Sequence, residues 1–111
     1  MLPKEKRIGR GQIEFVLKKG ESSTSKLFII RYIGNNKEIS RYAIVASAKL
    51  SKKAVERNRI RRQIYEAIRL IEKELTHNKS LDIVLIPKKQ ILKSEFEEIK
   101  EDLGGIIENH G

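Results

Sequence analysis

The densest group of side chains able to do chemistry lies in residues 49–62, KLSKKAVERNRIRR. Seven of them are lysine or arginine, and Glu56 is the one acidic residue. Several guanidinium groups on one rigid helix, beside the N–H groups at its start, suit phosphate binding. A charge run alone can equally be an ordinary solvated surface, but here almost no acidic partner neutralises it. We therefore expect RNA binding by Arg57, Asn58, Arg59, Arg61, Arg62, Lys49, Lys52 and Lys53.

Groups that could activate water or hold a metal ion are few. The chain has no cysteine, two histidines (His77 and His110) and two aspartates (Asp82 and Asp102). A protein nuclease needs a general acid and base, or carboxylates that grip metal ions. These four residues are too scattered in the sequence for either arrangement. We expect no catalytic residue on the polypeptide itself, and the sequence assigns no metal site.

Size and charge bound the class of protein. The 111 residues fit one domain, which we place at 1–111 as a single RNA-binding domain. The net charge of +9 attracts polyanions, and nucleic acid is the first candidate. There is no apolar span near twenty residues and no secretion signal, so we expect a cytoplasmic protein without membrane contact. No obligate protein partner is evident.

Hydrophobic periodicity predicts the elements that must position the basic cluster. They are a helix over 12–19, strands over 27–33 and 42–47, a helix over 54–75, a strand over 82–86, and a last helix opened by a capping box of Ser94 and Glu97. The first two strands read as an antiparallel hairpin, and residues 48–52 are a candidate for a further short strand. The fold class is α+β: a small mixed sheet of three to four strands with helices packed on it, in the order α-β-β-(β)-α-β-α.

The helix over 54–75 should present distinct faces at 100° per residue. Its apolar stripe comprises Ile60, Ile64, Ala67, Ile68, Ile71 and Leu75. One outer strip carries Asn58, Arg62, Tyr65 and Arg69, while Arg57 and Arg61 border the apolar stripe. The basic cluster should therefore lie on a rigid, outward-facing surface.

The hexapeptide Arg57–Arg62, preceded by a lysine-rich turn, resembles the signature of the bacterial ribonuclease P protein subunit. The resemblance runs along nearly the whole chain. It includes Met1-Leu2-Pro3-Lys4, Val16–Gly20, Phe28–Tyr32, Ser47–Val55 and Asp82–Ile86. One departure from the family is Ala48, which stands where a lysine is common.

The resemblance implies a fold with a left-handed crossover and assembly with ribonuclease P RNA. That RNA, using Mg²⁺ bound mainly by the RNA itself, would cleave the 5′ leader from precursor tRNA. The first helix and the sheet would form a cleft for the leader. The helix that begins near residue 54 would face the catalytic RNA near the cleavage site.

Leader-binding candidates follow from the same resemblance. Ile13 and Leu17 stand on the first helix at positions that are often aromatic in the family, which is a second departure. Phe28, Tyr32 and Tyr42 on the sheet could supply base stacking instead, although core packing is the alternative for each. Rival functions are a structural RNA-binding protein of ribosomal type, a self-sufficient nuclease and a DNA-binding regulator. A regulator would need a dimer with spaced half-sites, for which we see no segment.

Overall fold

The computed structural model describes residues 4–37, 39–74 and 80–110, without the side chains of Lys4, Asn109 and His110. Leu75, His77 and the His110 side chain, all considered above, lie outside this description. The elements, in chain order, are η1 (Lys4–Lys6), α1 (Arg10–Lys19), β1 (Glu21–Thr24), β2 (Phe28–Gly34), β3 (Arg41–Ile44), α2 (Ala54–Glu74), β4 (Leu81–Pro87), η2 (Lys89–Lys93) and α3 (Phe96–His110). None of the described helices is long and apolar enough to span a membrane.

The four strands form one mixed sheet in the order β1-β2-β4-β3. β2 runs antiparallel to both β1 and β4, and β3 runs parallel to β4. The predicted α+β class with a small mixed sheet is confirmed. Because parallel neighbours need a crossover, α2 carries the chain from β3 to β4. The left-handedness of this crossover stays a prediction of the family resemblance.

Three details of the predicted elements are wrong. β2 and β3 do not pair as a hairpin, because β4 lies between them. Residues 48–50 form a turn and no strand. The last helix exists, but Ser94 and Glu97 do not cap it. The Glu95 N–H donates to Glu98 Oε1 at 3.0 Å, one residue further on, and Ser94 Oγ donates to the Gln90 carbonyl instead. The fourth strand, β1, lies at the polar sequence ESST, where the sequence pattern predicted no strand.

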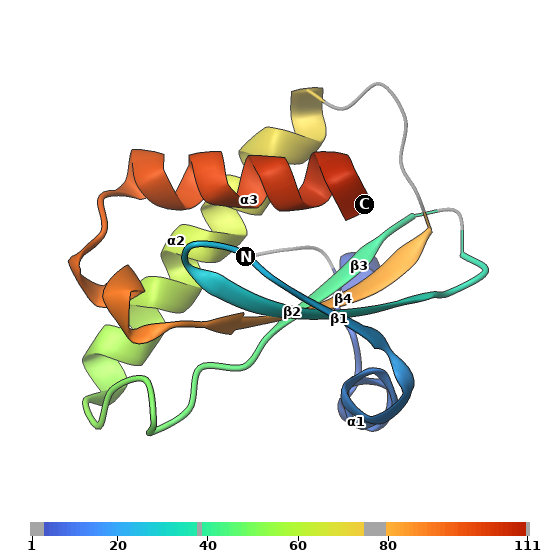
Figure 1. Ribbon diagram of the computed structural model, residues 1–111, viewed down its shortest axis with the longest axis horizontal. Helices are drawn as coiled ribbons and strands as arrows, with labels where there is room; N and C mark the ends of the chain where they lie inside the picture. Colours follow the sequence, from blue (N-terminus) through green and yellow to red (C-terminus); the bar gives the residue numbers. More distant parts are fainter. Residues whose placement is uncertain (1–3, 38, 75–79, 111) are drawn as a thin grey trace.

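Helices cover both faces of the sheet, with α2 and α3 on one side and α1 on the other (Figure 1). The main core fills the space between the sheet and the α2–α3 layer, and a smaller core lies under α1. Ile83 and Leu85 of β4 belong to the main core, while Val84 between them belongs to the smaller one. β4 is therefore an almost continuous apolar run, as expected for a strand buried on both faces.

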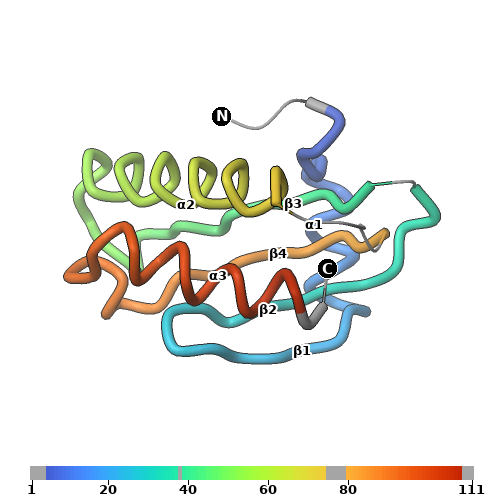
Figure 2. The backbone as a smooth tube through the Cα atoms, turned by 90° about the horizontal axis from the view of Figure 1, so that it is seen from above, coloured from blue at the N-terminus to red at the C-terminus, as the bar shows by residue number. Residues whose placement is uncertain are grey.

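The segment before α1 extends the sheet at its β3 edge. Arg7 forms a parallel bridge with Tyr42, and the Ile8 N–H donates to the Tyr42 carbonyl at 3.1 Å. Lys6 Nζ reaches Glu72 on α2 at 2.8 Å, so this segment also contacts the helix layer. Figure 2 shows the chain passing beside β3 before it enters α1 at one end of the strands. This route covers an edge strand that would otherwise offer unpaired backbone groups.

Candidate nucleic-acid interface

The connector between β3 and α2 holds three lysines on a compact turn. The Leu50 N–H donates to the Ser47 carbonyl at 3.0 Å, and the Lys53 N–H donates to Ser51 Oγ at 3.1 Å. The Leu50 side chain is buried in the main core and anchors the turn. The three lysines that the sequence nominated, Lys49, Lys52 and Lys53, are exposed on this anchored turn.

Two arginines of α2 fix the connector to the helix. Arg57 Nη1 donates to the Ser51 carbonyl at 2.8 Å, and Arg61 Nη2 donates to the Ala46 carbonyl at 3.1 Å. Ser51 Oγ also donates to Glu56 Oε1 at 2.5 Å, which ties the turn to the first turn of α2. These hydrogen bonds bring the connector lysines and the arginines of the helix into one cationic surface. We call residues 49–62 the basic surface.

The remaining arginines of the basic surface are available to a ligand. Within the described part of the chain, neither Arg59 nor Arg62 has a hydrogen bond or an ion pair. Arg62 is exposed and Arg59 is half-exposed. Guanidinium groups of this kind present forked donors that match phosphate oxygens. The sequence analysis nominated all four arginines alike, but their hydrogen bonds divide them into two pairs.

A hollow of about 570 Å³ lies beside this surface, lined by Asn58, Arg61, Arg62, Tyr65 and Glu66. Three of these residues, Asn58, Arg62 and Tyr65, were predicted to share one outer strip of the helix. Helical geometry alone placed them together, since they are spaced by three or four residues. Tyr65 was not nominated as a site residue, although an aromatic side chain beside arginines is a usable signal for nucleic-acid binding.

The predicted leader cleft is only partly assembled. Ile13 and Leu17 lie on the side of α1 that packs against the sheet, where both remain half-buried. Phe28 and Tyr42 are 0% and 1% exposed, and both belong to the core on the opposite, α2–α3 side. Their nomination for base stacking is therefore wrong, because no base can reach them. Burial raises the pKa of Tyr42, whose hydroxyl donates to Glu72 Oε2 at 2.9 Å.

Tyr32 also packs against the α2–α3 side, since it alternates along β2 with the buried Phe28 and Ile30. It is half-buried and does not share a face with α1. The face of β2 that α1 shares carries Ile29, which is 38% exposed, and Ile33. On α1 itself, the exposed aromatic side chain is Phe15, at 47%. The period of two along β2 could have revealed this separation of faces.

A buried carboxylate fixes α1 against the sheet. Asp82 is 0% exposed and accepts from Arg41 Nε at 2.8 Å, Arg41 Nη2 at 2.7 Å and Asn35 Nδ2 at 2.8 Å. Gln12 Nε2 of α1 donates to Asp82 Oδ2 at 3.0 Å. Burial acts to raise the pKa of Asp82, but the hydrogen bonds from Arg41, Asn35 and Gln12 together with the charge of Arg41 outweigh it and hold that pKa below its usual value.

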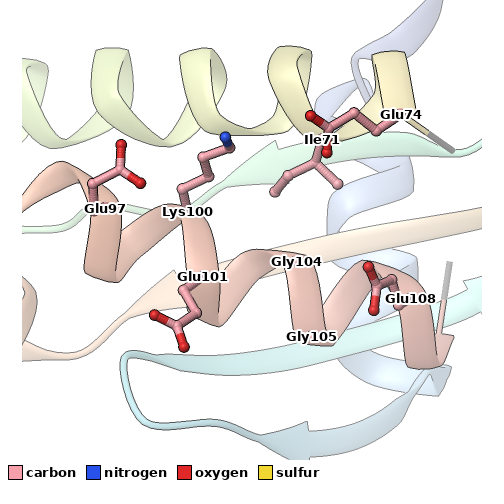
Figure 3. Close-up of a pocket in the computed structure, with 8 residues that line it drawn as sticks. All are labelled: Ile71, Glu74, Glu97, Lys100, Glu101, Gly104, Gly105 and Glu108. Atoms are coloured by element: carbon pink, nitrogen blue, oxygen red, sulfur yellow. The ribbon is translucent and has the colours of Figure 1, made fainter.

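The described residues do not assemble a metal site. No three histidine, aspartate or glutamate side chains among them come together as a set that could hold a metal. A hollow of about 540 Å³ between α2 and α3 is lined by Glu74, Glu97, Glu101 and Glu108 with Lys100 (Figure 3). Its negative charge makes it unsuited to RNA. The basic surface is the candidate interface.

Comparisons with known proteins identify the family of the chain. The family model described as Ribonuclease P matches residues 2–111. The ribonuclease P protein component of Syntrophomonas wolfei is 33% identical, over 100% of this chain and 92% of that protein. That of Mesoplasma florum is 33% identical over 94% of each chain. The ribonuclease P protein of Thermotoga maritima has a TM-score of 0.83 at 26% identity, covering 95% of this chain and 97% of that one. A chain that matches the family model along its length, shares the fold and carries the basic hexapeptide belongs to the ribonuclease P protein family.

Proposed function

We propose that this chain is the protein subunit of ribonuclease P. It binds the catalytic RNA and promotes endonucleolytic removal of the 5′ leader from precursor tRNA. The observation that carries the proposal is the basic surface, anchored by hydrogen bonds to the backbone and exposed in a member of this family. A ribosomal-type structural role would use similar charges, but the family match favours the processing enzyme.

The two pairs of arginines have different roles in this proposal. Arg59 and Arg62, with Lys49, Lys52 and Lys53, neutralise phosphates of the RNA. Arg57 and Arg61 hold the connector, so that the lysines keep a fixed position relative to the helix. Asn58 accepts a hydrogen bond from Arg61 Nη1 at 3.0 Å, which fixes the orientation of its amide on the surface.

The polypeptide contributes binding and position to the reaction. Mg²⁺ held mainly by the RNA supplies Lewis-acid chemistry at the scissile phosphate. The described carboxylates of the chain do not gather as a metal site, so the protein's own share is to neutralise phosphates and to hold the substrate. The leader lies on the α1 side of the sheet, near the half-buried Ile13 and Leu17 and the exposed Phe15 and Ile29.

The test is release of the leader from labelled precursor tRNA. Protein alone, a cognate ribonuclease P RNA alone, and both together are compared at low and high Mg²⁺. We expect no cleavage by protein alone, and a rate with both components that exceeds the rate with RNA alone at low Mg²⁺. Metal-dependent cleavage by RNA-free protein would contradict the proposal. So would a mixture no faster than the RNA alone, which is the result a ribosomal-type protein would give.

A further inference from the structure

The hollow on the outer side of α2 combines three kinds of side chain within two helical turns. Asn58, Arg61, Arg62 and Tyr65 follow one another at i, i+3, i+4 and i+7, so their side chains line one strip. The fifth lining residue, Glu66, makes an ion pair with Arg69, which offsets its charge. The hollow therefore keeps a cationic rim and one aromatic wall.

Tyr65 is held in place as that wall. It is half-buried, and it packs against the main core, to which its helix neighbours Ile64 and Ile68 belong. Burial raises the pKa of its hydroxyl, while the charges of Arg7 and Arg61 act to lower that pKa. The positive charges that act on this hydroxyl come from two elements, α2 and the segment before α1.

The polar groups around the ring retain unused donors. Arg61 uses Nη1 on Asn58 Oδ1 and Nη2 on the Ala46 carbonyl, so its plane is fixed beside the hollow. Because Asn58 Oδ1 accepts from Arg61, its amide nitrogen is left to donate to a ligand. Arg62, without an ion pair among the described residues, is the group best able to bind a phosphate.

We propose that this hollow binds one unstacked nucleotide of RNA. The base stacks on the Tyr65 ring, Arg62 binds the adjoining phosphate, and Asn58 donates to the nucleotide. The inference deepens the proposed function, on which it rests, by naming the part of the RNA that this section of the basic surface takes.

An unpaired, unstacked base is the form of RNA that fits. In a duplex both faces of each base are covered by its neighbours, so a protein ring cannot stack on them. Single-stranded RNA is commonly bound by a charged groove with aromatic platforms. The volume of about 570 Å³ lies in the range that holds a small organic ligand.

The experiment compares two strands of equal length, an oligouridylate and an abasic ribose-phosphate strand, each binding to the full chain. The ratio of the two affinities reports the contribution of the base. In Tyr65→Leu, which keeps an apolar side chain but removes the ring, this ratio should fall about 5- to 150-fold. Tyr65→Phe keeps the ring and should keep the ratio. Arg62→Gln should weaken both strands alike, because it removes the group that binds the phosphate.

An unchanged ratio in a folded Tyr65→Leu variant would overturn the nucleotide site. If that variant does not fold, ¹⁹F NMR of the wild-type chain carrying 3-fluorotyrosine decides instead. The chain has three tyrosines, and the Tyr65 signal is the one missing from Tyr65→Phe. The oligouridylate should shift this signal and the abasic strand should not; equal shifts with both strands would also overturn the site.

The same variants separate this inference from the proposed function. A chain that accelerates leader release but shows no base-dependent binding at Tyr65 refutes the nucleotide site alone. A chain that binds the base but does not accelerate release refutes the proposed function alone. Two further binding measurements identify the RNA that supplies the nucleotide. If Tyr65→Leu binds ribonuclease P RNA more weakly than the wild type does, the nucleotide belongs to that RNA. If Tyr65→Leu binds only precursor tRNA more weakly, and mature tRNA equally well, the nucleotide belongs to the leader.

Discussion

Arg57 and Arg61 share a sequence motif with Arg59 and Arg62, yet the four guanidinium groups have different roles. The first two donate to backbone carbonyls of the connector, and the other two have no partner in the described part of the chain. Two of these four arginines therefore stabilise the connector, and the other two are available to bind a ligand. The sequence could predict that these arginines lie together, since helical geometry is local. It could not predict which of them would reach Ser51 and Ala46, because those hydrogen bonds depend on the path of the connector.

Stability measurements should separate the two pairs. Arg61→Ala leaves the Ala46 carbonyl without its donor and should lower the free energy of unfolding by about 1–2 kcal/mol. Arg62→Ala, the matched control at the next position of the helix, removes an exposed guanidinium and should change that free energy by no more than about 0.5 kcal/mol. Urea denaturation of both variants at one fixed salt concentration measures this difference. Equal destabilisation of the two variants would contradict the division of roles.

Asp82 should make stability depend on pH in the acid range. Burial acts to raise its folded-state pKa, but the charge of Arg41 and the hydrogen bonds from Arg41, Asn35 and Gln12 together outweigh burial and hold that pKa below the ordinary value. A lowered folded pKa contributes stability that is fully present above the unfolded pKa of about 3.9 and is lost as the pH falls through the folded pKa. Asp82→Asn should cost about 3–5 kcal/mol near neutral pH, because it leaves Arg41 without its charged partner.

The measurement is the difference in unfolding free energy between wild type and Asp82→Asn from pH 7 down to pH 2. That difference should stay constant above about pH 5 and shrink below about pH 4. Using the difference removes the titration of other carboxylates, which both proteins share. A difference that is the same at pH 2 and at pH 7 would mean that Asp82 is not the titrating group.

At the scale of elements, the strands were easier to predict than their partners. β2, β3 and β4 each carry a run of β-branched or aromatic residues, and all three were found within a few residues of their bounds. Nothing in such a run says which strand lies beside it, so the sequence suggested a hairpin where β4 intervenes. β1 was missed because Glu21–Thr24 has no large apolar residue; pairing with β2 makes it a strand.

The same limit explains the stacking candidates. Phe28 and Tyr42 were nominated by residue type, and residue type does not say which face of a sheet a side chain occupies. Burial under α2 and α3 decides that, and it depends on packing between distant segments. The α2 residues of the basic surface were placed correctly because their arrangement is set within one helix.

Two glycines, one at the end of α1 and one within α3, should respond in opposite ways to replacement by alanine. A Cβ at Gly20 would lie 2.5 Å from the Val16 carbonyl oxygen and 2.8 Å from that of Tyr32, where α1 ends against β2. Gly20→Ala should therefore destabilise the fold. A Cβ at Gly105, in the interior of α3, would meet nothing within 4 Å. Gly105→Ala should raise the free energy of unfolding by about 0.5–1 kcal/mol, because alanine is the better helix former.

Thermal or urea unfolding of the two glycine variants makes the comparison with a single type of substitution. We expect the free energy of unfolding to fall in Gly20→Ala and to rise in Gly105→Ala. A general effect of adding a methyl group would change both variants in the same direction. Destabilisation by Gly105→Ala would contradict the prediction, because it would mean that a neighbour lies too close to Gly105 for a methyl group.

At the scale of the whole molecule, charge is divided between two regions. The basic surface on the connector and the first turns of α2 is separate from the hollow that Glu74, Glu97, Glu101 and Glu108 line. Residues 49–62 carry a net charge of +6, seven basic groups less Glu56, against +9 for the whole chain, so much of the excess positive charge lies where the proposed function places RNA. Such a distribution orients a polyanion toward one region of the molecule.

Salt dependence of RNA binding tests this division. Each phosphate that a lysine or arginine neutralises releases condensed counterions, so the logarithm of the affinity should fall linearly with the logarithm of salt concentration. With several phosphates neutralised on the basic surface, we expect a slope of about −3 or steeper for binding to ribonuclease P RNA. Titrations of the RNA with protein over a series of salt concentrations measure the slope.

Two variants show whether the position of a charge matters as well as its sign. The double variant Arg59→Ala/Arg62→Ala should make the slope shallower by about 0.7–0.9 for each phosphate that it leaves without a cation. Lys100→Ala also removes one positive charge, but from the acidic hollow between α2 and α3, so it should leave the slope unchanged. If Lys100→Ala reduced the slope as much per charge as the arginine variant, net charge alone would set the affinity, and the basic surface would have no special role.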